Sequence, residues 1–330
     1  MRLGKIPVTV ITGFLGAGKT TLVNHILDAT RSQRIGVIVN EFGEVGIDGQ
    51  LIVADEQAVI EISNGCICCT VRSDLVAGVR ELLFRYGDQL SHLIVETSGL
   101  ADPAPVLQTF LANPDVRDRV DLEAVVAVVD ACHVLAQLED DIAREQIVFA
   151  DRIIVNKSSA ASAAQRTTLK NVITALNPTA LVEFTNHCAI DTGGLLGVRS
   201  FSLDSLLAIE PNMLDEDVHD HEHDSAIASC AFVVEGEVDP DKFNRWVNQL
   251  VQAQGQQLLR MKGVLNMHGE GRRLHFHSVH MLMDTRFGKA WARDEPRENR
   301  FVIIGRGIDE VALRDGLFQC IDPVELPCLG

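Results

Sequence analysis

Blocks of lysine and arginine are missing from this chain. Its 330 residues contain 29 lysines and arginines against 46 aspartates and glutamates, which gives a formal net charge of −17 at pH 7. Proteins that bind nucleic acid or anionic membranes carry clustered positive charge, because phosphate groups dominate both of those surfaces. We therefore expect neither nucleic acid nor a membrane among the partners of this protein.

Long hydrophobic segments are missing as well, and we expect no secretory leader. No apolar run approaches the roughly eighteen residues of a spanning helix, and the N-terminus leads directly into a glycine-rich loop. In such a chain the eight cysteines favour thiols and metal ligands over a disulfide framework. These features predict a cytoplasmic protein. The length and the 46% apolar content suffice for two domains with ordinary cores.

The sequence does contain a phosphate-binding loop close to its N-terminus. The apolar, β-branched run 7–12 predicts a buried strand, and Gly13-Phe14-Leu15-Gly16-Ala17-Gly18-Lys19-Thr20 follows it. Glycines let the backbone curl so that successive N–H groups face phosphate oxygens. The lysine supplies charge for the β- and γ-phosphates, and the Thr20 hydroxyl can bind Mg²⁺. A helix expected at residues 21–27 directs its N-terminal dipole at the same anion. The motif predicts a nucleoside-triphosphate site.

Further apolar runs alternate with helical stretches up to about residue 200. They lie at residues 35–39, 93–95, 124–129 and 153–155, and such continuous runs are typical of parallel strands covered on both faces. We predict an α/β P-loop NTPase domain with a mostly parallel sheet. Functional residues are expected where the strands end. Polar residues at those positions are Asn40, Glu41, Glu44, Glu96, Thr97, Ser98, Asp130, Asn156 and Lys157.

A run of cysteines follows an Asn-Gly turn signal in the same domain. Three thiolates at the spacing of Cys66, Cys68 and Cys69 suit Zn²⁺, Co²⁺ or Cu⁺. A tetrahedral site needs a fourth ligand, for which Glu41, Glu44 or a nucleotide-linked water is the candidate. Single cysteines are commonly buried as small hydrophobic residues, and a thiol–disulfide role is a further alternative. The C-x-C-C pattern after a turn favours a metal site.

The second half of the chain reads as a separate domain. Residues 215–224 are acidic, lack a periodic apolar face and suggest a linker. Beyond it we predict strands at residues 230–234, around Leu265 and at 275–283 and 301–305, with helices at 239–257 and 309–320. This order fits a smaller α/β domain, for which a ferredoxin-like sandwich is one option. The predicted division is 1–210 for the P-loop domain, 211–226 for the linker and 227–330 for the C-terminal domain.

Four blocks of the first half, at residues 13–21, 40–48, 64–69 and 96–103, resemble the signature of the CobW family of P-loop GTPases. Short segments of the second half, such as Leu259-Arg260-Met261-Lys262-Gly263, are similar to the family's C-terminal domain. The resemblance therefore covers nearly the whole chain. CobW proteins belong to the metal-chaperone class and are related to the accessory GTPases of hydrogenase and urease maturation. The resemblance implies GTP hydrolysis coupled to delivery of zinc, cobalt or a similar ion to a client metalloprotein.

The resemblance also implies individual roles. The catalytic group would be Lys19, Thr20 as a Mg²⁺ ligand, Glu96 orienting magnesium or its water, and Gly99 contacting the γ-phosphate from a second switch. Residues 40–48 would form the first switch, ordered by the γ-phosphate and released after hydrolysis. No arginine finger is assigned, so intrinsic hydrolysis is expected to be slow. The nucleotide-binding set would be Gly13, Gly16, Ala17, Gly18, Lys19, Thr20, Thr21, Asn156 and Lys157. The metal set would be Cys66, Cys68, Cys69, Glu41 and Glu44, with Thr20 on magnesium.

The base-reading segment departs from the usual GTPase pattern. GTPases usually read guanine with N-K-x-D, whose carboxylate accepts two N–H bonds, but here the segment is Asn156-Lys157-Ser158-Ser159. A serine accepts only one such bond, and the loss of a charge-assisted pair costs about 1–3 kcal/mol. Asn156 and Lys157 can still flank the base. We expect a guanine preference weaker than that of a complete motif.

Two groups of histidines offer further metal-binding candidates. His219, His221 and His223 alternate with acids in the linker and suit either weak divalent-ion binding or an ordinary solvated linker. A second group on a predicted strand is better explained by half-exposed strand positions. Its members are His275, His277 and His280. The remaining cysteines are scattered and indicate no site.

These observations predict a GTP-hydrolysing metallochaperone with GTP, Mg²⁺ and Zn²⁺ or Co²⁺ as its ligands. The expected partner is a client metalloprotein, and a homodimer is a further candidate. One alternative is a metal buffer or sensor whose nucleotide binding is regulatory. A small-molecule kinase is a third option, disfavoured because no lid over a second substrate is recognisable.

Overall fold

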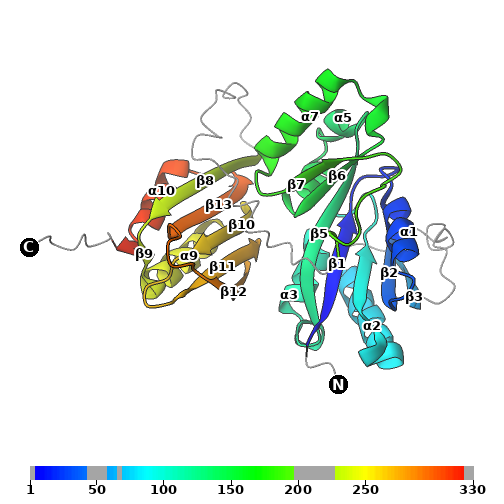
Figure 1. Ribbon diagram of the computed structural model, residues 1–330, viewed down its shortest axis with the longest axis horizontal. Coiled ribbons are helices and arrows are strands. Elements are labelled where there is room, and N and C mark those ends of the chain that lie inside the picture. The colour runs from blue at the N-terminus through cyan, green and yellow to red at the C-terminus, as the bar shows by residue number, and fades with distance from the viewer. Residues whose placement is uncertain (1–3, 43–57, 65–68, 197–226, 323–330) are drawn as a thin grey trace, which may run out of the picture. The chain divides into compact units, whose positions relative to one another are not determined.

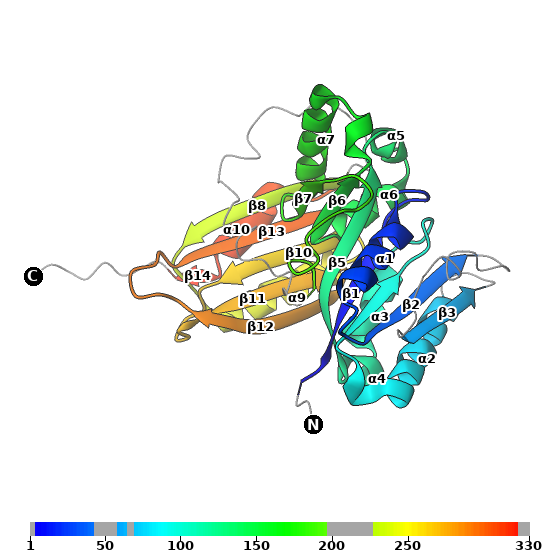
Figure 2. The ribbon, with the colours of Figure 1, turned by 45° about the vertical axis from the view of Figure 1, so that its right-hand side comes forward.

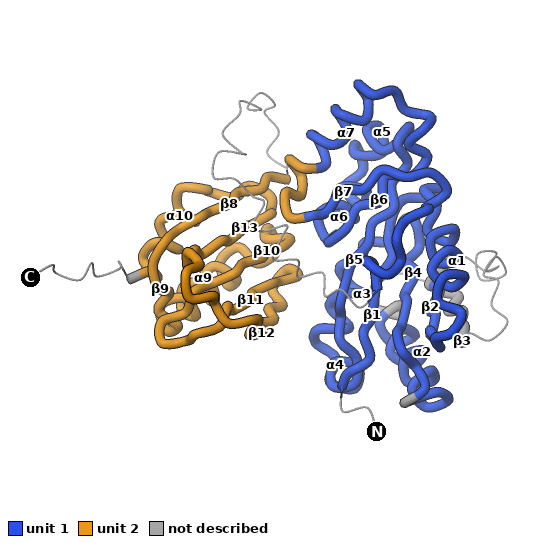
Figure 3. The backbone as a smooth tube through the Cα atoms, viewed as in Figure 1, with its two compact units in different colours: residues 1–173, 180–202 blue, residues 174–179, 203–330 orange. Residues whose placement is uncertain are grey.

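The computed structural model describes residues 4–42, 58–64, 69–196 and 227–322. The chain divides into two compact units, one of residues Met1–Ile173 and Ala180–Ser202 and one of residues Thr174–Thr179 and Leu203–Gly330 (Figure 3). The predicted linker with its three histidines lies outside the described residues. Within the described part of the chain, no helix is long and apolar enough to cross a membrane.

The first unit is built on a seven-stranded sheet in which every neighbouring pair runs parallel (Figures 1 and 2). The strand order is β3-β2-β4-β1-β5-β6-β7, which confirms the predicted parallel sheet. Five strands coincide with the predicted apolar runs, whereas β3 and β7 have no predicted counterpart. The strands are β1 (Ile6–Thr12), β2 (Ile35–Phe42), β3 (Ala58–Asn64), β4 (His92–Glu96), β5 (Val120–Asp130), β6 (Arg152–Asn156) and β7 (Leu181–Phe184).

Helices cover both faces of this sheet. On one face, apolar residues of α1 and of residues 188–196 share a core with β1, β2, β4, β5 and β6. On the other face lies α2, because a side chain at Gly36 of β2 would meet Leu82 of that helix, and α3 packs beside α2. The helices of this unit are α1 (Lys19–Ala29), α2 (Cys69–Tyr86), α3 (Ala104–Ala112), α4 (Pro114–Arg117), α5 (Val134–Gln137), α6 (Asp141–Val148) and α7 (Ala163–Leu176), with short 3₁₀ turns η2 (Gly87–Gln89) and η3 (Ser158–Ala160).

The second unit contains a five-stranded antiparallel sheet in the order β12-β11-β10-β13-β8, and a short pair formed by β14 and β9. Two helices, α9 and α10, share one hydrophobic core with the sheet, in which the rings of Phe243, Phe276 and Phe301 contact one another. The elements are β8 (Ile227–Glu235), β9 (Glu237–Val238), α9 (Pro240–Gln254), β10 (Leu258–Leu265), β11 (Arg272–Val279), β12 (Leu282–Ala290), β13 (Glu298–Arg306), α10 (Glu310–Phe318) and β14 (Ile321–Asp322).

The order of these elements is that of a ferredoxin-like fold with one insertion. Strand β13 lies between β8 and β10 and is antiparallel to both, so β8, α9 and β10 form a split β-α-β unit. After α10, β14 pairs with β9, which directly follows β8. The hairpin β11–β12 is added beyond β10 (Figures 1 and 2). Together these pairings give the strand order of a ferredoxin-like sheet widened by two strands.

One predicted element of this unit is wrong. The sequence predicts a single strand at residues 275–283, but the chain turns between β11 and β12 at His280 and Met281. His280 has a φ of +49°, a left-handed backbone conformation that lies outside the β region. The turn creates the hairpin and makes β12 the outermost strand of the sheet.

Candidate nucleotide-binding site

The phosphate loop connects β1 to α1, and its three glycines differ in what surrounds them. Gly13, Gly16 and Gly18 have φ values of +136°, +72° and +115°, in the left-handed region. A Cβ on Gly13 would lie 2.1 Å from the carbonyl oxygen of Val128 on β5, and one on Gly18 would lie 2.5 Å from Nδ2 of Asn156. At Gly16 a Cβ would meet no described atom within 4 Å, so only its dihedral angle favours glycine.

The helix after the loop begins at Lys19, two residues before the predicted start. Its N-cap, Gly18, is left-handed and makes no side-chain capping bond, so the first N–H groups of α1 can serve an anion. Lys19 is 8% exposed, and its Nζ donates a hydrogen bond to the carbonyl of Phe14 at 3.4 Å. The amine thus lies over the loop in the position that a triphosphate needs.

Thr20 and Glu96 form a hard-oxygen pair beside the loop. Thr20 Oγ1 donates a hydrogen bond of 2.8 Å to Glu96 Oε1, and Glu96 is only 2% exposed at the end of β4. A hydroxyl and a buried carboxylate are ligands that suit Mg²⁺, which prefers oxygen and retains several waters. The residues present therefore fit magnesium at this position.

Gly99 lies against the phosphate loop in a segment that α6 holds in place. A Cβ on Gly99 would be 2.7 Å from the backbone nitrogen of Leu15, so the two backbones are in direct contact. Gln146 of α6 is 2% exposed, and its Nε2 donates to the carbonyls of Gly99 at 3.2 Å and Ala101 at 3.3 Å. The sequence does not predict a role for Gln146, because nothing in its neighbourhood marks a helix residue as a partner of a distant loop.

The end of β6 and the residue after it are bonded to the phosphate loop through two side chains. Asn156 Nδ2 donates to the carbonyl of Ala17 at 2.9 Å, and Lys157 Nζ donates to the carbonyl of Gly16 at 2.9 Å. Lys157 also bonds Asp130 Oδ2 at 2.7 Å. Burial raises the pKa of Asp130, but hydrogen bonds, chiefly from Lys157, outweigh it and hold that pKa below its ordinary value. The carboxylate therefore stays charged and fixes the lysine.

A second loop, after β7, completes this region. Asn186 Oδ1 accepts a hydrogen bond from the backbone N–H of Ser159 at 2.9 Å. The backbone N–H of Cys188 donates to Asn156 Oδ1 at 3.1 Å, and its Sγ lies 3.4 Å from the carbonyl of Gly18. Burial raises the pKa of Cys188 to about 12, so this thiol stays protonated and acts as packing. The sequence indicated no site at Cys188. Its contact with Gly18 joins residues that are 170 positions apart, and sequence spacing cannot reveal such a contact.

The predicted metal ligands can be located only by the course of the backbone. Glu44, Cys66 and Cys68 lie outside the described residues, and Cys69 begins α2. Strands β2 and β3 pair in parallel with Glu41 opposite Ser63, one residue before β3 ends at Asn64. The chain that leads into the cysteine run thus leaves the sheet beside Glu41. Whether these residues bind a metal together stays a prediction.

The described histidines do not form a metal site. His275 and His277 lie two apart on β11 and are half-buried, whereas His280 is in the turn. His277 Nε2 is 3.8 Å from Asp284 Oδ2. Among the described residues, no group of three or more His, Cys, Asp or Glu side chains is arranged to hold a metal ion.

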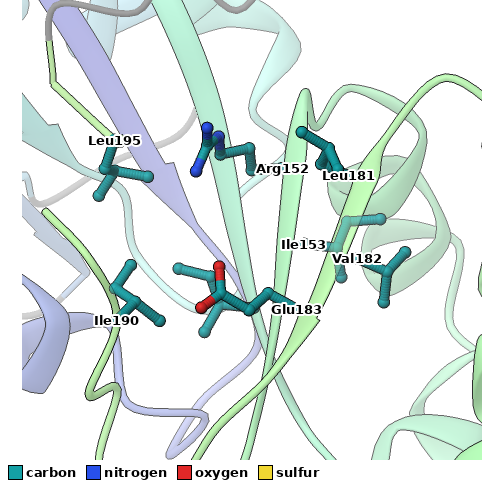
Figure 4. A pocket seen from close by; sticks show the side chains of 8 residues that line it. Arg152, Ile153, Leu181, Val182, Glu183, Ile190 and Leu195 are labelled. Carbon is teal, nitrogen blue, oxygen red and sulfur yellow. The ribbon is translucent and has the colours of Figure 1, made fainter. Parts of the chain in front are cut away.

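A cavity of about 250 Å³ lies elsewhere in the first unit (Figure 4). Arg152 and Glu183 extend from β6 and β7 toward Ile190 and Leu195 on the opposite wall. Arg152 is the first residue of β6, at the end of the strand opposite to Asn156. The cavity is therefore separate from the phosphate loop.

Two family models match this chain. Residues 7–183 match the CobW/HypB/UreG nucleotide-binding domain, and residues 227–321 match the cobalamin synthesis protein CobW C-terminal domain. The chain belongs to the CobW family. This confirms the resemblance seen in the sequence blocks. It also places the Asn156–Lys157 segment and the phosphate loop within one family domain.

Curated CobW relatives match over nearly their full length. The chain is 34% identical over 317 residues to the zinc chaperone YjiA of Escherichia coli, covering 94% of this chain and 98% of the relative. It is 35% identical over 349 residues to the zinc chaperone CobW of a Sinorhizobium species, covering 94% and 96%. The crystal structure of the Zn(II)-bound YjiA GTPase superposes with a TM-score of 0.71 at 29% identity, covering 97% of this chain and all of that one. A Zn(II)-bound YjiA triple mutant, in which one glutamate and two cysteines are replaced by alanine, matches equally well.

Proposed function

We propose that this chain is a GTP-hydrolysing zinc chaperone that binds its metal at the C-x-C-C segment and releases it to a client protein. The proposal rests on CobW family membership, on the names of the relatives and on the arrangement of the nucleotide site. GTP is the substrate, and the metal ion is cargo. Zinc is the expected cargo, because thiolates favour it and the relatives are named for it. Cobalt is the second candidate.

The strand order is the observation that carries the proposal. From the outer edge inward, the strand ends belong to β3, β2, β4 and β1. Strand β3 precedes the cysteine run, and β2 contains Glu41. Strand β4 ends in Glu96, and β1 precedes the phosphate loop. Neighbouring strands are about 4.8 Å apart, so β3 and β4 are separated by roughly 10 Å. A metal held after β3 would therefore lie within one or two side-chain lengths of the nucleotide site.

This proximity supports a nucleotide-controlled metal site. The first switch, at residues 40–48, begins on β2, between the strand that precedes the cysteines and the strand that ends in Glu96. In the proposed mechanism, Thr20 and Glu96 hold Mg²⁺, which neutralises phosphate charge when bound. Lys19 binds the β- and γ-phosphates, and Gly99 lies against the loop where the γ-phosphate belongs. Ordering of the first switch by GTP would bring Glu41 and Glu44 toward the cysteines, and hydrolysis would loosen them.

The test is the affinity of the full chain for Zn²⁺ and Co²⁺ with GTP–Mg²⁺, with GDP–Mg²⁺ and without nucleotide. We expect one tight equivalent that needs GTP. Because binding equilibria are linked, the metal must strengthen GTP binding by the same factor, typically about 5–150-fold. Replacing Cys66, Cys68 and Cys69 together by serine should remove the tight equivalent and the metal effect on GTP. Binding of GTP–Mg²⁺ itself should be unchanged.

The matched control is Cys132→Ser, which changes an exposed cysteine elsewhere in the same unit. It should leave the number of bound metal equivalents unchanged. It should also leave the effect of the metal on GTP binding unchanged. Zinc also binds a YjiA variant that lacks a glutamate and two cysteines, so equivalents bound at other positions must be counted separately. Equal metal affinity with GTP and GDP would contradict the switch and leave a static metal site beside an independent nucleotide site.

The competing function is a metal buffer or sensor with regulatory nucleotide binding. A buffer holds metal stoichiometrically, and its GTP turnover does not respond to a partner. A chaperone is expected to turn over GTP faster when an apo client protein accepts the metal. Measuring turnover with zinc-loaded chaperone and an apo zinc enzyme separates the two functions. Loss of metal from the chaperone without any rise in turnover would favour the buffer.

A further inference from the structure

Strand β12 forms one edge of the C-terminal sheet. Among the described strands it pairs with β11 alone (Figure 2). Its side chains alternate between half-buried and exposed along most of its length. An edge strand presents a row of backbone N–H and C=O groups that can pair with another strand. The chemistry of this edge therefore decides whether it is protected or available.

The edge is protected only at its far end. The register between β11 and β12 shifts between Phe287 and Ala290, which places an extra residue in β12 at a bulge. Bulges and lysines are common means of blunting an edge, and here Gly288 and Lys289 lie in that bulge. From Leu282 to Phe287 the register is regular, and this stretch contains neither proline nor lysine. That part of the edge can accept a partner strand.

The regular stretch is self-complementary about its centre. It reads Met283-Asp284-Thr285-Arg286-Phe287, so an antiparallel copy centred on Thr285 sets Asp284 opposite Arg286 and Met283 opposite Phe287. We propose that β12 pairs with β12 of a second copy of this chain about a two-fold axis at Thr285. The axis makes every contact twice, as in other isologous dimers.

The charges select this register over its neighbours. A two-fold axis perpendicular to the sheet leaves each side chain on its original face of the sheet. The axis must therefore lie level with a residue of the strand and not between two residues. Centring on Asp284 would set two aspartates opposite each other, and centring on Arg286 would set two arginines opposite each other. Directly opposite unlike charges stabilise a sheet pair, and like charges destabilise it. Thr285 is the centre that pairs both charges.

The apolar side chains of the strand favour the same register. On the face that carries α9, Met283 is 39% exposed and Phe287 is 52% exposed. Both line a cavity of about 400 Å³ between α9 and the added hairpin, together with Phe243 and Leu274. Pairing about Thr285 sets each methionine sulfur against the aromatic ring of the second copy, a favourable contact. It also joins the two cavities side by side.

Within one chain, Asp284 and Arg286 already form an ion pair with each other. Arg286 Nε donates to Asp284 Oδ2 at 2.9 Å, and their side chains are 38% and 33% exposed. Pairing exchanges this contact for the same contact between copies, so no charge is left buried alone. One short stretch of strand is small beside the roughly 1,200–2,000 Å² of a stable interface. The dimer is therefore expected to be weak and to depend on concentration.

The test is sedimentation velocity of the full chain over a concentration series. We expect reversible dimerisation of the wild type. Asp284→Arg and Arg286→Asp should each raise the dimer Kd by about tenfold or more, because each like-charge contact occurs twice. The double variant Asp284→Arg/Arg286→Asp should restore the dimer. Mixing the two single variants should also restore it, since their strands are complementary. Circular dichroism of each variant reports whether it is folded.

Glu81→Arg is the control, because it breaks an exposed ion pair with Arg85 on α2, away from this strand. It should leave the dimer unchanged. A wild type that stays monomeric at every soluble concentration overturns the proposal. So do folded single variants that dimerise as the wild type does, or a mixture of them that stays monomeric. None of these outcomes bears on the GTP-dependent metal site.

Discussion

At the scale of single residues, the proposed contact between Lys19 and the phosphates is the first testable feature. Lys19 lies over the loop, bonded to the carbonyl of Phe14. We expect Lys19→Ala to lower GTP turnover by roughly 10²–10³-fold, because a preorganised cation at the β- and γ-phosphates is lost. Steady-state phosphate release measures it. Lys170→Ala, which changes an exposed lysine on α7, is the control. Wild-type turnover in Lys19→Ala would refute the assignment, and metal binding without nucleotide should survive.

Selection of the base is the second feature at this scale. Ser159 occupies the usual aspartate position, and its N–H is bound by Asn186 Oδ1. We expect Ser159→Asp to tighten GTP relative to ATP by about 5–150-fold, equivalent to the roughly 1–3 kcal/mol of a charge-assisted hydrogen-bond pair. Competition binding of the two nucleotides measures the ratio. Thr167→Asp adds the same charge at an exposed position of α7 and should have no effect.

An unchanged ratio in Ser159→Asp would show that other groups already read guanine. Asn186 is then the candidate to examine, because its amide lies beside Ser159. Its position could not be predicted from the sequence. Asn186 is 27 residues from Ser159, and only the parallel pairing of β6 with β7 brings the two loops together.

At the scale of elements, α6 and the segment after β4 act as a pair. Gln146 donates to two carbonyls, those of Gly99 and Ala101. We expect Gln146→Leu to weaken GTP binding several-fold and to leave GDP binding nearly unchanged, because leaving a buried acceptor without its donor costs about 1–3 kcal/mol and loosens the γ-phosphate side of the site. Fluorescent-nucleotide binding measures both affinities. Equal weakening for GDP and GTP would indicate a general loss of structure instead.

The sequence predicts the central strands better than the outer ones. Residues 124–129 form a continuous apolar run because β5 is covered on both faces. Strand β7 is an outer strand whose residues alternate between exposed and half-buried positions, and its four residues include Glu183. Outer strand β3 likewise contains Glu61 and Ser63. A search for continuous apolar runs misses such strands, since polar residues interrupt the run.

The strand that was wrongly predicted at residues 275–283 of the second unit also has a physical explanation. Residues 275–283 have a strand-like composition on both sides of His280, and nothing local marks the left-handed turn there. The pairing of Val279 with Leu282 across that turn stabilises it from outside the turn itself. The candidate nucleotide site was more predictable, because Lys19 and Thr20 belong to one contiguous loop motif and Glu96 ends a strand. Gln146, Asn186 and Cys188 join the site through tertiary contacts alone.

At the scale of the whole molecule, one buried histidine links stability to pH. His92 of β4 is bonded to Thr9 of β1 at 2.8 Å, and burial lowers its pKa from 6.5 to about 4. Below pH 6.5 the unfolded chain gains a proton that the folded chain does not. Stability therefore falls as the pH drops toward 4, by about 2 kcal/mol between pH 7 and pH 5 for this group.

Urea unfolding of the wild type and of His92→Asn at both pH values measures this contribution. We expect the variant to be less stable at pH 7 but to lose about 2 kcal/mol less than the wild type on acidification, because the titrating group is gone. The comparison removes the effect of carboxylates that titrate in both proteins. Identical pH dependence of the two proteins would mean that His92 is as easily protonated in the folded chain as in the unfolded one.

The motif G-x-x-x-x-G-K-T fixes Gly13 and Gly18 and leaves position 16 open, and the structure separates the three glycines of the loop in the same way. A side chain at Gly13 would collide with the backbone of β5, and one at Gly18 would collide with the side chain of Asn156. At Gly16 only the dihedral angle disfavours a side chain. Asparagine adopts that left-handed conformation at modest cost. A gene library that varies all three codons should therefore recover folded chains with asparagine at position 16 far more often than at the other two. The fixed residues of the motif are thus set by the neighbouring strands as well as by the phosphate.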